Sequence, residues 1–218
     1  NKVLNTRDCS LGWHYRSRHN SLINFSNKFF YNNDLTVFPS NKIGSEINLI
    51  KVENSQYQKS INRPEILKVI ETFKAQIKDD PSKTILIATM NKDQADEIQI
   101  ELDKETNKDQ NIADYLSRHN GELEKLLIKN LENVQGDERD IVIISTVYGP
   151  DPDGKVSNNF GDVSKAQGDR RLNVLLTRAK DKIFLVTSLN SSDVRPNPAA
   201  VTGSKYLKEY LQYAETGK

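Results

Sequence analysis

The sequence predicts an α/β protein in which a mostly parallel sheet is covered by helices on both faces. Short apolar runs such as 83–89 and 140–148 have the composition of strands buried on both faces, which is typical of parallel sheets. Between such runs lie longer segments whose apolar residues recur at helical spacing, so strands and helices alternate along the chain. No internal repeat or low-complexity tract interrupts this alternation. We therefore expect residues 1–218 to form one domain.

The composition excludes several classes of protein. The 218 residues suffice for one sizeable core, and a formal net charge of +1 excludes a strongly basic coat protein but allows a local basic groove. The single cysteine, Cys9, and three unclustered histidines predict no disulfide, no metal site and a reducing, cytoplasmic setting. No apolar run approaches the ~20 residues of a membrane span, so no membrane partner is expected. Because the chain opens at Asn1 without structural context, we expect a piece of a longer protein.

The first half of the chain is expected to alternate between helices and strands. The expected order is an irregular segment at 4–18, a helix at 20–30, a strand at 47–52, a helix at 62–79, a strand at 83–89, a helix at 91–106 and a short helix around 115–116. Trp13 and Tyr15 are predicted to anchor the irregular segment. Asn62 followed by Glu65 has the spacing of a capping box, and Asn91 is the predicted cap of the next long helix.

The second half is expected to complete the sheet. Its predicted order is a strand at 126–130, a polar turn at 133–140, a strand at 140–148, a loop at 149–168, a helix from 169, a strand at 183–187, a loop at 195–204 and a terminal helix. The loop at 149–168 is too long for a simple connection, so it is expected to be functional or mobile. The helix after it is predicted to carry Arg171 and Arg178 on nearly the same side, because they lie seven residues apart. Asp181 and Lys182 are expected to turn the chain into the last strand.

Arg178 is the strongest single candidate for a functional residue. A guanidinium held between a buried helix and a buried strand cannot lose its proton, so it requires an anion. Phosphate suits the planar fork of an arginine best. The alternative is that Arg178 pairs with a carboxylate of its own domain or extends to solvent.

The polar turn contains a second set of candidates. Open α/β sheets bind ligands at the carboxyl ends of strands, and Gly136 would let backbone N–H groups approach such a ligand. Gln135 can donate and accept hydrogen bonds, whereas Glu138 only accepts, which suits a ribose hydroxyl. An ordinary tight turn is the alternative for this segment.

The segment WHYRSRH at 13–19 contains a third set. Arg16 and Arg18 stand beside aromatic residues, so each guanidinium either stacks on a ring at the surface or leaves its fork free for phosphate. The residues alone do not decide between these alternatives.

Together, WHYRSRH, VQGDERD and RRLNVLLTRAK resemble motifs IV, V and VI of the superfamily 1 helicases, in that order along the chain. The resemblance continues through NFGDVSKAQGDRRLN and looks closest to the branch that includes the nonsense-decay helicase and large bacterial helicase-like proteins. It implies a RecA-like three-layer fold. The resemblance assigns γ-phosphate contacts to Arg16 and Arg178, a base contact to Tyr15, and further nucleotide contacts to Gln135, Gly136 and Glu138.

The chain lacks two motifs of a complete helicase, the G-x-x-x-x-G-K-[ST] phosphate loop and an acidic magnesium-binding motif. The resemblance therefore implies only the second RecA-like domain, whose arginines act on ATP and Mg²⁺ that are held mainly by a first domain. Closure and reopening of the two domains would step the protein along single-stranded DNA or RNA. Thr89, Asn91, Ser145 and Thr146 at strand ends are the candidate contacts to that strand. For Thr89 and Asn91, a helix cap is the alternative.

Two other classes of function stay open at this stage. A non-enzymatic nucleic-acid- or protein-binding module that kept the fold would bind single strands in a salt-dependent way and would tolerate replacement of Arg178. A nuclease ranks lower, because no His, Asp and Glu cluster with metal-ligand spacing lies on one predicted element. In the helicase interpretation, the isolated chain is expected to be inactive towards ATP.

Overall fold

The computed structural model describes residues 12–37, 46–197 and 203–217. At its centre is a five-stranded sheet with strand order β3-β9-β8-β6-β7, in which every neighbouring pair is parallel. The strands are β3 (Ile47–Lys51), β6 (Ile85–Thr89), β7 (Leu127–Asn130), β8 (Arg139–Ser145) and β9 (Ala179–Thr187). This sheet confirms the predicted fold class.

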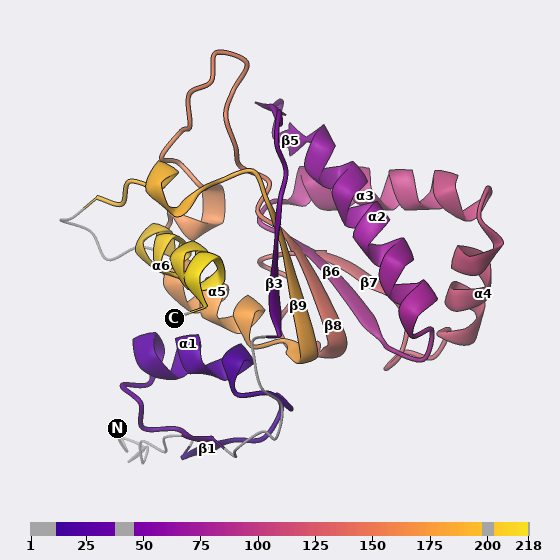
Figure 1. The fold of residues 1–218 in the computed structure, drawn as a ribbon, viewed down its shortest axis with the longest axis horizontal. Helices are drawn as coiled ribbons and strands as arrows, with labels where there is room; N and C mark the ends of the chain where they lie inside the picture. Colours follow the sequence, from indigo (N-terminus) through magenta and orange to yellow (C-terminus); the bar gives the residue numbers. More distant parts are fainter. Residues whose placement is uncertain (1–11, 38–45, 198–202, 218) are drawn as a thin grey trace, which may run out of the picture.

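Helices cover both faces of the sheet (Figure 1). On one side lie α1 (Ser21–Phe30), α5 (Gly168–Leu176) and α6 (Gly203–Thr216). On the other side lie α2 (Arg63–Asp79), α3 (Lys92–Thr106) and α4 (Gln110–Arg118). Two apolar cores result, one on each face, and β8 contributes Val142 and Ile144 to the first and Ile141 and Ile143 to the second. This double burial explains the uninterrupted apolar run of β8.

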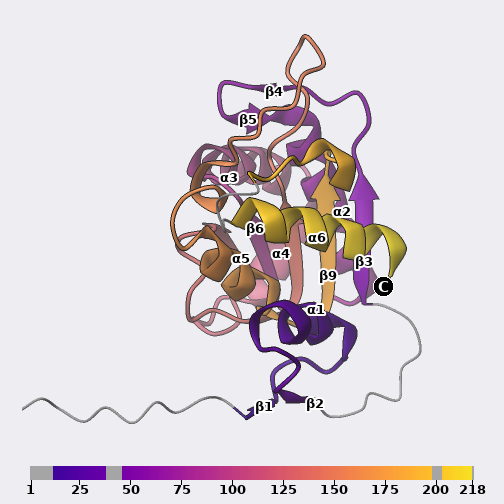
Figure 2. The ribbon, with the colours of Figure 1, turned by 90° about the vertical axis from the view of Figure 1, so that its left-hand side faces the viewer.

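In the part of the chain that the structure describes, two small sheets and two short turns of 3₁₀ helix complete the fold. The strand β1 (Trp13–His14) pairs in parallel with β2 (Thr36–Val37), and β4 (Tyr57–Gln58) pairs with β5 (Ile61–Asn62). The 3₁₀ turns are η1 (Gly161–Val163) and η2 (Ser191–Asp193). The segment from β1 through α1 to β2 lies at the edge where the strands of the main sheet begin (Figure 2). The predicted irregular segment at 4–11, part of the loop before β3 and part of the loop before α6 lie outside the described residues.

The predicted helix caps are present, with one difference. The side chain of Asn62 accepts a hydrogen bond from the backbone N–H of Glu65, and the side chain of Asn91 accepts one from Gln94. The capping box at α2 is only half formed, because the carboxylate of Glu65 does not return to the backbone of Asn62, whose N–H bonds Gln94 instead. Glu65 is fully buried and accepts hydrogen bonds from the ends of β8 and β9.

Two predictions about the end of α5 were wrong. Arg178 does not lie on the helix, which ends at Leu176, where the hydroxyl of Thr177 bonds back to the last turn. Asp181 and Lys182 do not form a turn, because β9 already begins at Ala179 and runs through both residues. Helical periodicity continued past the true end of α5 in the sequence, but pairing of Ala179 with Arg139 of β8 starts the strand there.

Two further expectations are corrected at other places. Trp13 and Tyr15 are not buried anchors, since their exposed fractions are 57% and 72%. The strand expected at 140–148 ends at Ser145, and Val147 has a φ of 70°, which is unusual for a β-branched residue. The backbone N–H of Val147 bonds the carboxylate of Glu65, which holds this conformation.

Candidate functional site

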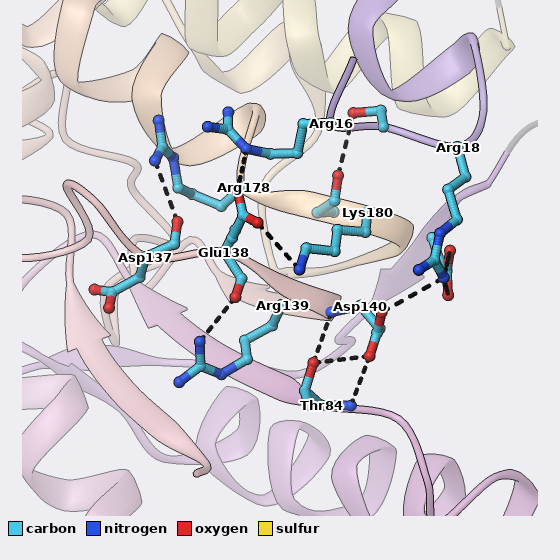
Figure 3. A network of polar contacts seen from close by, with 12 residues as sticks. Arg16, Arg18, Thr84, Asp137, Glu138, Arg139, Asp140, Arg178 and Lys180 are labelled. Atoms are coloured by element: carbon cyan, nitrogen blue, oxygen red, sulfur yellow. Dashed lines mark hydrogen bonds and ion pairs between the residues drawn. The ribbon is translucent and has the colours of Figure 1, made fainter. Parts of the chain in front are cut away.

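Arg16, Glu138 and Arg178 meet at the edge of the sheet where β8 and β9 begin (Figure 3). Glu138 immediately precedes β8 and Arg178 immediately precedes β9, whose first residues pair with each other. The backbone N–H of Arg139 also bonds the carbonyl of Arg178 at 3.2 Å. The expectation of a ligand site at the carboxyl ends of the strands is therefore corrected, because these candidates gather at the amino ends.

Arg16 reaches this edge because its segment runs beside the start of β9. The hydroxyl of Ser17 bonds the carbonyl of Ala179 at 3.2 Å, and the N–H of Arg18 bonds the carbonyl of Lys180 at 2.8 Å. These contacts join the WHYRSRH and TRAK motifs, which are more than 150 residues apart in the sequence. Arg16 and Arg178, the two arginines predicted from the sequence, are thus brought together by the tertiary structure.

Arg16 is held by a carboxylate. Its Nε lies 2.6 Å from Oε2 of Glu138, and its Nη1 bonds the carbonyl of Thr177 at 3.3 Å. The other carboxylate oxygen of Glu138 lies 3.1 Å from Nζ of Lys180. Hydrogen bonding from Arg16 and then Lys180 lowers the pKa of Glu138, so this side chain is charged at neutral pH.

Arg178 has a different environment. Its Nε bonds the carbonyl of Val174 at 2.7 Å and its Nη1 bonds the carbonyl of Asp137 at 3.2 Å. No ion pair between described residues includes Arg178. Burial and then the charge of Arg16 lower the pKa of Arg178, but a guanidinium stays protonated at neutral pH. Within the described ranges, the alternative in which Arg178 pairs with an internal carboxylate is therefore not observed.

The local charge is therefore unbalanced in favour of an anion. Arg16, Lys180 and Arg178 contribute three positive charges, and Glu138 is the only carboxylate that they contact among the described residues. The side chain of Asp137 pairs with Lys129 instead. Three cations against one carboxylate can accept further negative charge from a ligand.

A cavity of about 230 Å³ lies beside two of these cations, Arg16 and Arg178, whereas Lys180 and Glu138 do not line it. Arg16 and Arg178 line it together with the rings of Trp13 and Tyr15, whose centroids are 6.4 Å apart. Asn173, one turn before Thr177 on α5, also lines the cavity. The cavity is thus lined by both cationic and aromatic side chains, which suits a ligand in which an anion is attached to a planar ring.

The other candidates for nucleotide contact are not part of the cavity wall. Gln135 and Gly136 are exposed and do not line it. Gly136 has a φ of 90°, and a Cβ at this position would meet no atom within 4 Å, so backbone conformation requires glycine here. The predicted ribose contact of Glu138 stays a prediction, because a carboxylate with two partners still has acceptor capacity.

The candidate contacts to a nucleic-acid strand lie at the opposite edge of the sheet, where strands end. Thr89, Ser145 and Thr146 are fully buried. The hydroxyl of Ser145 bonds Glu65 at 2.6 Å, and that of Thr146 lies 2.7 Å from the hydroxyl of Thr187. Asn91 is partly exposed and caps α3, which was the alternative to a nucleic-acid contact at this position. In this arrangement the three hydroxyls are satisfied within the chain.

Sequence reasoning missed Lys180 as a member of the site. Lys180 follows Arg178 by two residues, and the two-residue period of a strand places such side chains on one face. This signal was masked because the strand was expected to begin only at 183. Trp13 was noticed as an anchor, and its position in the cavity wall could not be derived from local sequence.

The described residues contain no group of three His, Cys, Asp or Glu side chains that could hold a metal ion. Among the same residues, no helix has both the length and the apolar character to cross a membrane.

A family model places the chain in a known class. The chain belongs to the AAA domain family, whose model matches residues 43–190. The match includes Glu138, Lys180 and Arg178, whereas Arg16 precedes it.

Two curated relatives carry the names of helicases. The chain is 36% identical over 209 residues to the uncharacterized ATP-dependent helicase MG140 of Mycoplasma genitalium, and equally to its homolog in Mycoplasma pneumoniae. Each alignment covers 94% of this chain but only 18% of the relative, so the chain spans less than a fifth of their length.

Two solved structures are distantly similar. The C-terminal domain of a possible DNA helicase from Lactobacillus plantarum is 14% identical, with a TM-score of 0.41, and the match covers 85% of this chain and 95% of that one. The Hef helicase domain of Pyrococcus furiosus is 18% identical, with a TM-score of 0.35 and coverage of 61% and 27%. At these scores neither likeness bears on the function of the chain.

Proposed function

We propose that the chain is the second motor domain of an ATP-dependent superfamily 1 helicase or translocase. In this proposal Arg16 and Arg178 contact the γ-phosphate of ATP that a first domain of the same protein holds together with Mg²⁺. The observation that carries the proposal is the pair of guanidinium groups lining one cavity, of which Arg178 has no carboxylate partner among the described residues. The family match and the names of the two curated relatives support it.

The residues present fit a phosphate group. Two of the five N–H donors of Arg178 bond backbone carbonyls, so others are available to oxygen atoms of an anion. ATP supplies the transferable phosphoryl group. The two arginines of this chain would neutralise the negative charge that develops on it, and the cavity wall would exclude water from their forks.

The exposed ring of Tyr15 is the proposed contact for the base. It is 72% exposed and lies next to Arg16 in the sequence, so a nucleotide delivered from outside the chain can reach both. Gln135, Gly136 and Glu138 are the proposed neighbours of the sugar and phosphates.

We propose that single-stranded DNA or RNA contacts the opposite edge of the sheet. Asn91 is partly exposed there, whereas Thr89, Ser145 and Thr146 would need local opening or would act through neighbouring backbone groups. The proposed setting is the cytoplasm, with no membrane partner.

The test is single-strand-stimulated ATP hydrolysis by the full-length protein that contains this chain. Arg178→Ala should lower kcat at least about a hundredfold, as removal of an arginine finger does. Arg171→Ala is the matched control, because Arg171 belongs to the same motif but does not line the cavity. A loss of less than tenfold for Arg178→Ala, together with tight, salt-dependent single-strand binding by the chain alone, would favour the non-enzymatic binding module instead.

A further inference from the structure

The two arginines of the WHYRSRH segment have different tasks in the structure. Arg16 lines the cavity, whereas Arg18 is not part of the cavity wall and pairs with Asp181 on β9. Arg18 also lies 3.6 Å from a carboxylate oxygen of Asp140 on β8 (Figure 3). The Nη1 of Arg18 lies 3.0 Å and 3.1 Å from the two carboxylate oxygens of Asp181. The side chain of Asp181 is only 11% exposed and also bonds Nζ of Lys83 at 2.6 Å, so it is a fixed acceptor.

Polar contacts join the segment to the start of β9. The side chains of Trp13 and Tyr15 are mostly exposed, whereas the hydroxyl of Ser17 and the backbone of Arg18 face β9. The contacts between the segment and β9 include the hydrogen bond from the hydroxyl of Ser17 to the carbonyl of Ala179, the hydrogen bond from the N–H of Arg18 to the carbonyl of Lys180, and the Arg18 ion pair with Asp181.

These contacts set the register of the two arginines that line the cavity. Arg18 follows Arg16 by two residues, and Asp181 follows Arg178 by three. Residues 16–18 and 178–181 run side by side. The ion pair between Arg18 and Asp181 therefore limits how far Arg16 can shift relative to Arg178. Arg18 itself pairs more closely with Asp181 than with Asp140 and is not part of the cavity wall.

We propose that the Arg18–Asp181 ion pair, called the clip below, fixes the position of the Arg16 guanidinium relative to that of Arg178. This inference rests on the proposed function, because it assumes that both forks bind one anion. We expect the pair to add little to the stability of the fold, because the side chain of Arg18 is 61% exposed and solvent screens its charge. Its effect is on geometry, since a small misplacement of a binding group is costly for the ligand it serves.

The test measures binding of inorganic tripolyphosphate to the chain by isothermal titration calorimetry. The variants are Arg16→Ala, Arg18→Ala, Arg178→Ala and the double variant R16A/R18A. Arg18→Ala should weaken binding about five- to tenfold. In the Arg16→Ala background the same change should cost less than about twofold, because the clip acts only through Arg16. A merely structural role would weaken binding equally in both backgrounds.

The chain contains a matched control for the clip. Arg63 pairs with Glu101 with side-chain exposures of 44% and 11%, close to the 61% and 11% of Arg18 and Asp181, but lies away from the cavity. Arg63→Ala should leave tripolyphosphate binding unchanged and should shift the thermal unfolding midpoint as much as Arg18→Ala does. If Arg18→Ala fails to fold, Asp181→Asn takes its place in the experiment, because it removes the negative charge of the same ion pair.

The outcomes separate the clip from the proposed function. Wild-type affinity in Arg18→Ala, or an equal loss in the Arg16→Ala background, overturns the clip while a large loss in Arg178→Ala still supports the anion site. If Arg178→Ala binds tripolyphosphate like the wild type, or the wild type does not bind it, the anion site fails and the clip fails with it.

Discussion

The Nε of Arg16 lies 2.6 Å from a carboxylate oxygen of Glu138, so an internal anion occupies one of the two guanidinium groups in the cavity. Arg178 bonds only backbone carbonyls among the described residues. The two arginines therefore differ in what an incoming anion must do: it can bind Arg178 directly, but it competes with Glu138 for Arg16. This difference has a measurable consequence.

Glu138→Gln should strengthen the binding of inorganic tripolyphosphate to the chain. The change removes a negative charge beside Arg16 and Lys180, and at low salt we expect the dissociation constant to fall about three- to tenfold. Because tripolyphosphate has no ribose, the measurement is independent of any contact between Glu138 and a sugar. Isothermal titration calorimetry gives the constants. Glu122→Gln is the control, since Glu122 pairs with Lys125 at the surface, and weaker binding by Glu138→Gln would show that the carboxylate supports the site.

His14 should report the charge of Arg16. Burial, and then the charge of Arg16, lowers the pKa of His14 below its ordinary value of 6.5. Because the folded-state pKa is depressed, His14 stabilises the fold fully above pH 6.5, and this contribution is lost as the pH falls from there towards the folded-state pKa. Arg16→Ala should raise the pKa of His14, measured by NMR titration of the ring C–H protons. Arg63→Ala should leave it unchanged, and an unchanged or lowered pKa in Arg16→Ala contradicts the assignment.

Glu65 should be essential for stability. Its carboxylate accepts hydrogen bonds from the hydroxyl of Ser145 at 2.6 Å and from the backbone N–H groups of Val147 and Ser188, both at 2.8 Å. Glu65→Gln would turn an N–H group towards these donors, and we expect a loss of about 2–4 kcal/mol in the free energy of unfolding, measured with urea. Glu71→Gln, at an exposed position on the same helix, should change it by less than about 0.5 kcal/mol. Equal effects of the two variants would contradict the stabilising role of the hydrogen bonds to Glu65.

Gly168 should not tolerate a side chain at the start of α5. A Cβ there would lie 2.1 Å from the carbonyl oxygen of Val163, so backbone would have to move. Gly168→Ala is expected to cost about 3 kcal/mol or more of unfolding free energy. Gly121 is the matched position, because a Cβ there meets nothing within 4 Å, and Gly121→Ala should be neutral or slightly stabilising. Similar urea midpoints for the two variants would contradict the contact.

Most of the secondary structure was predictable because it depends on local patterns. Asn62 and Asn91 cap α2 and α3 as predicted, since a cap needs only a side-chain oxygen two or three residues before a free N–H. The predictions failed where a partner decided the outcome. Arg178 leaves the helical pattern because Ala179 pairs with Arg139, 40 residues away. Glu65 does not complete the predicted capping box, because its carboxylate accepts hydrogen bonds from Ser145 and Ser188 at the ends of β8 and β9.

The sequence by itself determined the α/β class, the parallel sheet and the identity of Arg16 and Arg178 as candidates, because burial periodicity and side-chain chemistry are properties of local segments. Only the tertiary structure decided that these arginines meet at the amino ends of β8 and β9, on the edge opposite Thr89, Ser145 and Thr146. Only it showed that Glu138 holds Arg16. The physical reason is sequence distance: the Arg16 and Glu138 side chains are 122 residues apart along the chain, and no local pattern encodes a contact that the packing of the whole sheet creates.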